Sequence, residues 1–366
     1  MRYLERLDKI QAVLRRKKLD ALLVSQPQNR RYLSGYAAVD HGIAESSGFL
    51  LIPAKGQPLL LTDFRFKLQA EAEAHFLPVV LYPKGLLALL KDLLPDLQIR
   101  SLGFESDYTL YAVAGKLKTL ADKIGIQLLP TTGLVEKLRL IKDEEEIGKL
   151  RTSVALNEQV FTRIYHSLDA GRTERDIALD IDMTMQRLGA EAPSFDTIVA
   201  WGPKSALPHA VPGSVVIERG QPLMIDMGLI LDGYCSDMTR TFVLGEPDDR
   251  YLSIHRLVRR AQLAALAAIR AGVTAAAVDK IARDIITDAG YGPAFGHSLG
   301  HGVGLAVHEE PRLSSRNKKT LQAGMVVTVE PGIYIPGWGG VRLENMVVVH
   351  EDGCELLNKN STWLDL

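Results

Sequence analysis

The chain has 366 residues, and its 43 lysine and arginine residues nearly balance its 44 aspartate and glutamate residues, for a net charge of −1. A chain of this length usually divides into two domains, each large enough to bury a core. The near-neutral charge gives no electrostatic reason to expect nucleic acid or an anionic membrane as a partner. We therefore expect a small or peptidic substrate.

The cysteines and the N-terminal residues bear on the compartment. Cys235 and Cys354 lie far apart and form no CxxC pair, so they predict neither a disulfide framework nor a zinc ribbon. Residues 1–6 carry charges where a signal peptide needs an apolar stretch, and the leucine-rich run of residues 86–97 is too short and too charged to span a bilayer. These features predict a cytoplasmic protein without a membrane anchor.

The first third of the chain predicts an α/β domain. Apolar residues at positions 4, 7, 10, 13 and 14 are spaced for one face of a helix. Residues 21–24 then predict a buried strand, and residues 48–52 and 58–62 predict a hairpin. Further helices are expected after Lys84 and Thr109. This region contains no obvious active-site constellation.

A turn at residues 130–133 interrupts this pattern, and the acidic run at residues 143–146 suits the positive end of a new helix. We place a domain boundary near residue 131, which gives domains of residues 1–131 and 132–366. The alternative is one continuous domain with a surface turn at this point.

The second domain contains an internal duplication. Residues 170–173 open a predicted helix that ends at Gly189, and residues 271–274 open one that ends at Gly290, so both ends are offset by 101 residues. In the strand pairs that follow, Asp226 corresponds to Glu330 at an offset of 104 residues. Asp237 and Glu344 are the second acidic position of each half. Two such units about a pseudo-twofold axis would bring all four carboxylates together.

The first strand pair can be placed from its turn. Asp232-Gly233 is typical of a two-residue hairpin loop between residues 223–231 and 234–244. With these two residues as the loop, Asp226 lies opposite Thr239, and Asp237 points to the same face as Asp226. Their Cβ atoms would then be diagonal neighbours at most about 8 Å apart, close enough to share a pair of metal ions. A longer loop would change this register.

The second strand pair raises the same question of charge. Glu330 follows the apolar run at residues 326–329, and Glu344 lies among apolar residues. Buried carboxylates are costly unless a positive charge compensates them. Arg240 and Arg342 are the only cations inside these strands, which leaves two carboxylates unpaired. Two divalent cations would neutralise all four and would hold a nucleophilic hydroxide between them.

Residues 295–311 concentrate His297, His301 and His308 among glycines. A single histidine is more often a core residue, but three in one glycine-rich segment before a carboxylate strand favour a functional site, with His301 as a fifth metal ligand. An oxygen-rich set with one imidazole favours manganese, cobalt or iron over a structural zinc ion. The segment is neither a dinucleotide fingerprint nor an HExxH motif.

These segments resemble those of the pita-bread metallopeptidases, peptidase family M24, in the branch of Xaa-Pro aminopeptidases and Xaa-Pro dipeptidases (prolidases). The resemblance covers nearly the whole chain and implies an α/β (α+β) protein with a creatinase-like N-terminal domain and a pseudo-twofold pita-bread catalytic domain. The segments that carry it are Ile225-Asp226-Met227-Gly228, Gly233 with Asp237-Met238-Thr239-Arg240, Gly300-His301-Gly302, Val329-Glu330-Pro331-Gly332 and Val341-Arg342-Leu343-Glu344-Asn345.

The resemblance also implies the roles of individual residues. It implies two divalent ions, manganese or cobalt first and iron or zinc as alternatives, and a homodimer that acts on short proline-containing peptides. Glu330 would also accept a proton, and the roles of the three catalytic histidines are interchangeable at this stage. The implied metal ligands are Asp226, Asp237, His301, Glu330 and Glu344, and the implied substrate-binding residues are His209, His297, His308 and Arg342.

Within this family the expected activity is that of an Xaa-Pro aminopeptidase, because no feature closes the site against a third substrate residue. The alternative is an Xaa-Pro dipeptidase. Methionine aminopeptidases lack an N-terminal domain of this kind, and five intact ligand positions argue against creatinase, which has such a domain but is metal-free. The complete ligand set is the feature that bears on the remaining alternative. A non-enzymatic pita-bread binding protein is disfavoured for the same reason.

Overall fold

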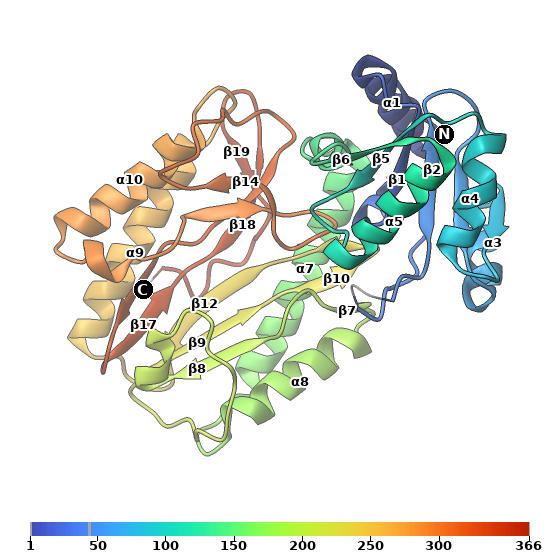
Figure 1. The fold of residues 1–366 in the computed structure, drawn as a ribbon. Helices are drawn as coiled ribbons and strands as arrows, with labels where there is room; N and C mark the ends of the chain where they lie inside the picture. Colours follow the sequence, from blue (N-terminus) through green and yellow to red (C-terminus); the bar gives the residue numbers. More distant parts are fainter. Residues whose placement is uncertain (1, 43–44, 366) are drawn as a thin grey trace. The chain divides into compact units, whose positions relative to one another are not determined.

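The computed structural model describes residues 2–42 and 45–365. The chain forms two compact units, Met1–Arg139 and Leu140–Leu366 (Figure 1). Among the described residues, no helix is long and apolar enough to cross a membrane.

The first unit is built on a six-stranded sheet with the strand order β4-β3-β2-β1-β5-β6. β2 and β3 form the hairpin that the sequence predicts, and β1 pairs antiparallel with β2 and parallel with β5. The strands are β1 (Ala21–Val24), β2 (Phe49–Pro53), β3 (Leu59–Thr62), β4 (Val79–Leu81), β5 (Ser101–Glu105) and β6 (Gln127–Thr131).

Helices cover this sheet because each has one apolar face. α1 buries Leu7, Ile10 and Leu14, as its spacing predicts, and α4 and α5 share an apolar cluster with β1, β2, β3 and β5. The helices are α1 (Arg2–Lys17), α2 (Pro27–Ser34), η1 (Phe64–Phe66), α3 (Lys67–Glu73), α4 (Leu86–Asp96), α5 (Tyr111–Ile124) and α6 (Glu136–Arg139).

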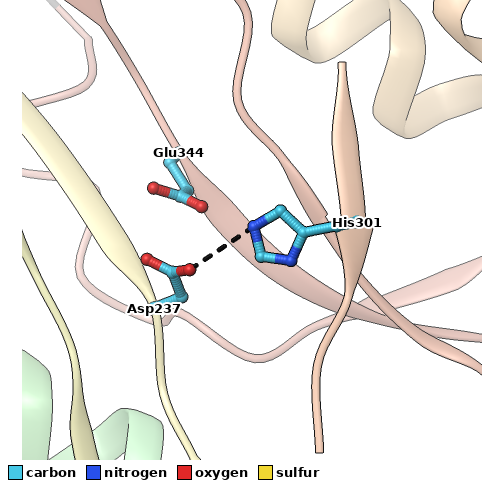
Figure 2. A group of neighbouring side chains, drawn as sticks. All are labelled: Asp237, His301 and Glu344. Carbon is cyan, nitrogen blue, oxygen red and sulfur yellow. Dashed lines mark ion pairs between the residues drawn. The ribbon is translucent and has the colours of Figure 1, made fainter. Parts of the chain in front are cut away.

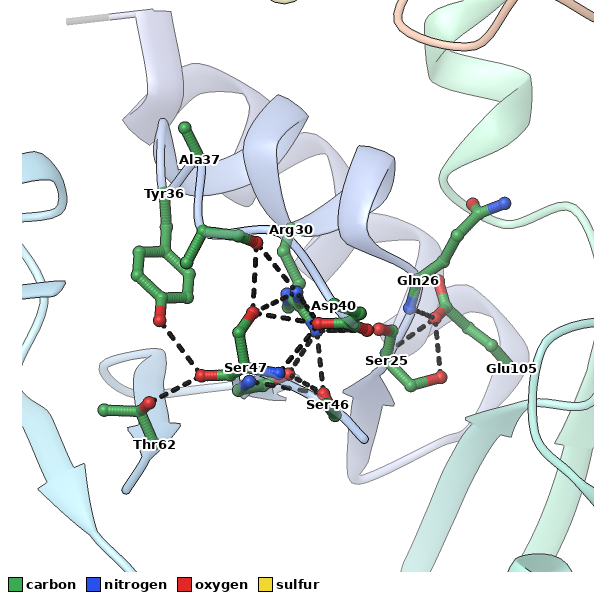
Figure 3. A network of polar contacts seen from close by, with 12 residues as sticks. Ser25, Gln26, Arg30, Tyr36, Ala37, Asp40, Ser46, Ser47, Thr62 and Glu105 are labelled. Carbon is green, nitrogen blue, oxygen red and sulfur yellow. Dashed lines mark hydrogen bonds and ion pairs between the residues drawn. The ribbon is translucent and has the colours of Figure 1, made fainter. Parts of the chain in front are cut away.

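A fully buried arginine organises the segment that follows α2 (Figure 3). Arg30 donates to Asp40 Oδ1 at 2.7 Å, to Ser47 Oγ at 2.7 Å and to the carbonyl oxygen of Ser25 at 3.0 Å. Nearby, Glu105 accepts from the backbone amide of Ser25 at 2.6 Å. These hydrogen bonds from both Nη atoms tie an irregular segment to the sheet, and removal of Asp40 would leave the buried charge uncompensated.

The second unit consists of two similar halves, and the first half packs two helices against strands (Figure 1). Asp143 and Thr173 cap α7 and α8 through capping boxes, so both predicted helix starts are confirmed. The elements are α7 (Glu144–His166), α8 (Glu174–Arg187), β7 (Ala192–Pro193), β8 (Ile198–Trp201), η2 (Gly202–Ala206), β9 (Pro222–Met227), β10 (Leu229–Leu231), β11 (Tyr234–Cys235) and β12 (Met238–Val243).

The second half repeats this plan, with Thr274 as the N-cap of the predicted helix α10. α9, which follows the N-cap Asp248, is a helix that the sequence analysis did not predict. The elements are α9 (Asp249–Ala268), α10 (Ala275–Asp288), η3 (Gly292–Ala294), β13 (Gly300–Gly302), β14 (Glu309–Leu313), β15 (Val326–Val329), β16 (Gly332–Ile335), β17 (Gly339–Arg342), β18 (Asn345–Val349) and β19 (Cys354–Leu356).

The predicted register of the first strand pair is confirmed. Asp232 and Gly233 both have positive φ, 49° and 82°, as a two-residue hairpin turn of type I′ requires. Asp226 consequently pairs with Thr239. A break at Gly228 divides the pair into β9–β12 and β10–β11, and a Cβ atom at Gly228 would lie 2.1 Å from the carbonyl oxygen of Ser236.

The two halves meet along the strands that carry the acidic residues. The backbone amide of Glu344 donates to the carbonyl oxygen of Thr239 at 3.1 Å, and the amide of Arg342 donates to Thr241 Oγ1 at 3.1 Å. In Figure 1, α7 and α8 lie outside the strands of the first half, and α9 and α10 lie outside those of the second. The carboxylates therefore lie where strands of both halves adjoin.

Candidate metal centre

A cavity of about 740 Å³ lies in the second unit, and it contains every site residue that the sequence analysis named. Carboxylates, histidines and two arginines line it together with apolar side chains and two serines. The predicted residues that line it are His209, Asp226, Asp237, His297, His301, His308, Glu330, Arg342 and Glu344.

Each carboxylate is delivered by a strand or by the end of one. Asp226 lies within β9, and Asp237 lies between β11 and β12. Glu330 directly follows β15, and Glu344 lies between β17 and β18. Asp226, Asp237 and Glu344 are buried, and the side chain of Glu330 is 15% exposed. Both halves thus contribute two acidic side chains to one cavity.

His301 faces this acidic group from β13, where the neighbouring glycines let strands approach closely. A Cβ atom at Gly300 would lie 2.0 Å from the carbonyl oxygen of Thr328. Asp237, His301 and Glu344 each offer one ligand atom, and these three atoms lie within 4.8 Å of one another (Figure 2). His301 Nε2 is 3.6 Å from Asp237 Oδ2 and 3.4 Å from Glu330 Oε1.

The tautomer of His301 suits metal ligation. Its Nδ1 lies 3.1 Å from the carbonyl oxygen of Gly302, so Nδ1 carries the proton and the Nε2 lone pair faces the carboxylates. Burial lowers the pKa of His301 to about 4, which keeps the ring neutral near pH 7. A neutral imidazole beside carboxylates gives no positive charge to offset them.

The carboxylates themselves need a cation. Burial first, and then repulsion from neighbouring carboxylates, raises the pKa values of Asp237, Glu330 and Glu344, the last to about 8. The buried Oδ1 of Asp226 has no hydrogen-bond partner among the described residues. Carboxylate oxygens with an imidazole lone pair form a donor set for divalent ions. The residues present therefore fit the predicted metal centre.

The two strand arginines act differently from each other. Arg342 Nη2 donates to Asp226 Oδ2, and Arg342 Nε donates to Thr239 Oγ1 at 2.9 Å. Arg240 instead donates to the backbone carbonyl of Glu344 and to Asn345 Oδ1. Only Arg342 forms an ion pair with one of the four carboxylates within the described part of the chain. The single positive charge of Arg342 leaves most of the negative charge of the four carboxylates uncompensated.

The three predicted histidines occupy different environments. His297 is held at both ring nitrogens, since Nδ1 is 2.8 Å from the carbonyl oxygen of Ser298 and Nε2 is 2.9 Å from the hydroxyl of Tyr334. Burial lowers the pKa of His297 to about 4. His209 and His308 are exposed, and the rings of His308 and His301 lie 4.4 Å apart. Of the three, His209 and His308 are the more accessible to substrate.

Several residues that line the cavity or support its lining were not predicted from the sequence. Tyr334 links His297 to Arg342 Nη1, which it accepts from at 2.8 Å. Arg312 lies in β14 and lines the cavity four residues after His308, which directly precedes this strand. Because side chains alternate along an extended segment, this even spacing could have predicted that both residues point to the same face. Phe195 and Ile198 form part of its apolar wall, and their sequence carries no distinctive signal.

Comparisons with known proteins agree with this geometry. Residues 148–351 match the metallopeptidase family M24, and residues 6–141 match the creatinase/prolidase N-terminal domain. The chain belongs to metallopeptidase family M24. The predicted family and fold, a creatinase-like domain followed by a pita-bread domain, are confirmed, and the chain is a peptidase that depends on divalent metal ions.

Relatives within family M24 are similar over nearly the whole chain. An Xaa-Pro dipeptidase of Pyrococcus horikoshii is 35% identical, over 97% of each chain. The solved structure of an Xaa-Pro dipeptidase from Bacillus anthracis has a TM-score of 0.91 and 38% identity, with 98% of each chain covered. An X-Pro aminopeptidase structure from Thermotoga maritima has a TM-score of 0.85 and 37% identity, covering 94% of this chain and 96% of its own.

Proposed function

We propose that this M24 peptidase is an Xaa-Pro dipeptidase, which hydrolyses the bond between one residue and a C-terminal proline. The observation that carries the proposal is the whole-length similarity to Xaa-Pro dipeptidases, one at 35% identity and one solved at a TM-score of 0.91. The aminopeptidase expected from the sequence is the second candidate, and the similarity to the Thermotoga maritima enzyme favours it.

The cavity supplies a physical reason for a preference for dipeptides. Arg312 lines it and is exposed, and its guanidinium forms no hydrogen bond or ion pair with the described residues. The guanidinium of Arg342, by contrast, is occupied by Asp226, Thr239 and Tyr334. A dipeptide carries its C-terminal carboxylate next to the scissile bond, and a guanidinium binds a carboxylate in a bidentate manner. Arg312 is therefore our proposed anchor for that carboxylate.

The apolar wall of the cavity suits proline. Phe195, Ile198, Pro208, Val211 and Pro212 line it. An Xaa-Pro bond is a tertiary amide without an N–H donor, and the proline ring fixes its own φ. A site for this bond can select by shape, because no backbone donor of the substrate proline needs an acceptor.

We propose that Asp226, Asp237, His301, Glu330 and Glu344 hold two divalent ions, manganese or cobalt in preference to iron or zinc. When bound, these ions supply Lewis-acid activation of the carbonyl group and of the attacking water. The preference for manganese or cobalt rests on the donor set, four carboxylates and one imidazole.

The remaining steps belong to the chain's own side chains. Glu330 is our proposed general base, and Thr328 Oγ1, 3.2 Å from Glu330 Oε1, orients it. We propose that His308 and His209 donate hydrogen bonds to the carbonyl oxygen as negative charge develops on it. His297 is held by Tyr334 and helps to fix the cavity wall.

The proposal is tested with purified protein supplied with Mn²⁺ or Co²⁺, by comparing kcat/KM for Ala-Pro, Ala-Pro-Ala and Ala-Ala-Ala. We expect Ala-Pro to be the preferred substrate. Preferred cleavage of Ala-Pro-Ala would transfer the assignment to the aminopeptidase, and equal or better cleavage of Ala-Ala-Ala would refute selectivity for proline.

A further inference from the structure

We propose that Glu174, a buried carboxylate that does not line the cavity, is a positioning residue that fixes the loop carrying His209. This loop, here called the His209 loop, comprises residues 202–216. The inference rests on the proposed function, because it assigns Glu174 an effect on hydrolysis through His209.

Glu174 lies at the start of α8 and is 0% exposed. It accepts hydrogen bonds from the backbone amides of Trp201 and Gly213, each at 3.0 Å, and it forms an ion pair with Lys204. Trp201 directly precedes the His209 loop, Lys204 lies near its start and Gly213 lies near its end. One carboxylate thus joins both ends of the loop to the same turn of helix.

The internal duplication shows that the architecture alone does not require this carboxylate. In the first half, the amides of Glu174 and Arg175 donate to the carbonyl oxygens of Val215 and Gly213. In the second half, at offsets of 101 and 104 residues, the amides of Ala275 and Ala276 donate to the carbonyl oxygens of Lys319 and Asn317 in the same way.

Two further contacts repeat between the halves. Gly171 donates to Ile217, which donates back to Arg172, and Gly272 donates to Leu321, which donates back to Val273. The position of Glu174 is occupied by Ala275 in the second half, and both are fully buried. The backbone pairing therefore forms without a carboxylate, so the side chain of Glu174 serves something specific to the first half.

What is specific to the first half is the His209 loop. His209 is exposed at the cavity, and the segment before it is held from the cavity side by Arg342 Nη1, which donates to the carbonyl oxygen of Pro208 at 3.2 Å. Ser205 Oγ accepts from the amide of Gly340 at 2.8 Å. Glu174 holds the same segment through separate contacts with Trp201, Lys204 and Gly213, so that His209 projects from a segment anchored at several points.

The test compares Glu174→Ala, which reproduces the residue of the second half, with the wild-type enzyme in its metal-loaded form. We expect kcat/KM for Ala-Pro to fall on the order of 10- to 100-fold, the usual effect of displacing a substrate-contacting group. Metal content by elemental analysis should not change. Glu174→Gln keeps one acceptor oxygen without the charge and should show an intermediate loss. Arg175→Ala, on the exposed side of the same turn, is the matched control.

Two readouts separate positioning from a general structural role. In a His209→Ala background, Glu174→Ala should cost less than about 2-fold, because a residue that acts through another is not additive with it. Equal losses in both backgrounds, or no effect of His209→Ala, would overturn the proposal. Amide hydrogen exchange in Glu174→Ala should accelerate at residues 204–213 and stay unchanged at residues 317–321; an unchanged rate at residues 204–213 would also overturn it.

The failure of the proposed function can be told apart from the failure of this inference. If the wild-type chain cleaves no Xaa-Pro peptide, the proposed function fails, and the exchange measurement still decides whether Glu174 fixes the loop. If Ala-Pro is cleaved and Glu174→Ala is unimpaired, only the positioning role fails.

Discussion

Replacement of Arg312 by glutamine tests whether the cavity binds the carboxylate of a dipeptide. An exposed ion pair is worth less than about 1 kcal/mol, whereas a hydrogen bond to a buried charged group is worth about 1.5–3 kcal/mol. Arg312 is exposed but lines the cavity, which places its contact with a bound carboxylate between these limits, at about 1–2 kcal/mol. We therefore expect Arg312→Gln to lower kcat/KM for Ala-Pro roughly 5- to 30-fold.

The assay pairs Ala-Pro with Ala-Pro amide, which has the same scissile bond and no carboxylate. Arg312→Gln should leave kcat/KM for the amide within about 2-fold of the wild-type value, since the lost contact is absent from that substrate. Arg316→Gln removes an exposed arginine that does not line the cavity and serves as the matched control. Equal losses on both substrates would refute a contact with the carboxylate, as would an unimpaired variant.

Three further predictions follow from the same geometry. A chelator should abolish hydrolysis of Ala-Pro, and Mn²⁺ or Co²⁺ should restore it; full activity in protein shown by elemental analysis to be metal-free would contradict the metal centre. Glu330→Gln should retain the fold and lower kcat by about 100-fold or more in steady-state assays at saturating metal, the usual contribution of a general base, and an unchanged kcat would remove Glu330 from the reaction. Burial lowers the pKa of His255 from 6.5 to about 4, and Arg259 adds to this shift while Asp365 opposes it. Between these two pH values, His255 therefore binds a proton in the unfolded chain but not in the folded chain. The free energy of unfolding should therefore fall by about 3 kcal/mol on acidification through that window, and urea titrations of His255→Gln should show a shallower dependence, whereas an unaltered profile would assign the loss to other groups.

Features determined by neighbouring residues could be predicted from the sequence. The Asp232-Gly233 turn sets the strand register, and the register opposes Asp226 and Thr239. The helix starts at Thr173 and Thr274 can be predicted because a threonine side chain at the N-cap accepts a hydrogen bond from a backbone amide of the first turn. α9 has a comparable local signal, an N-cap aspartate followed by buried residues at helical spacing, and could have been found in the same way.

Contacts between distant residues could not be predicted in this way. Arg342 pairs with Asp226 from 116 positions away, and Tyr334 meets His297 from 37 positions away. The first contact depends on the packing of the two halves against each other and the second on packing within the second half, and no local pattern specifies either. The network around Arg30 is a further example, because an arginine after a predicted strand gives no sign that it will be fully buried.

The registers of the two strand pairs explain how the four carboxylates converge. In the second half, Val329 pairs with Asn345 and Gly332 pairs with Arg342, in one continuous register. Glu330 and Glu344 fall opposite each other in the gap between these pairs.

Asp237 lies in the equivalent kind of gap, between β11 and β12, while Asp226 alone remains within a strand. Alternation places Asp237, two residues from the Thr239 that pairs with Asp226, on the same face as Asp226. The continuous register of the second half places Glu330 and Glu344 on one face as well. The contact between Glu344 and Thr239 then brings the two carboxylate pairs to one cavity. Each half then provides two carboxylates, and their combination with His301 is the donor set that we propose for two ions.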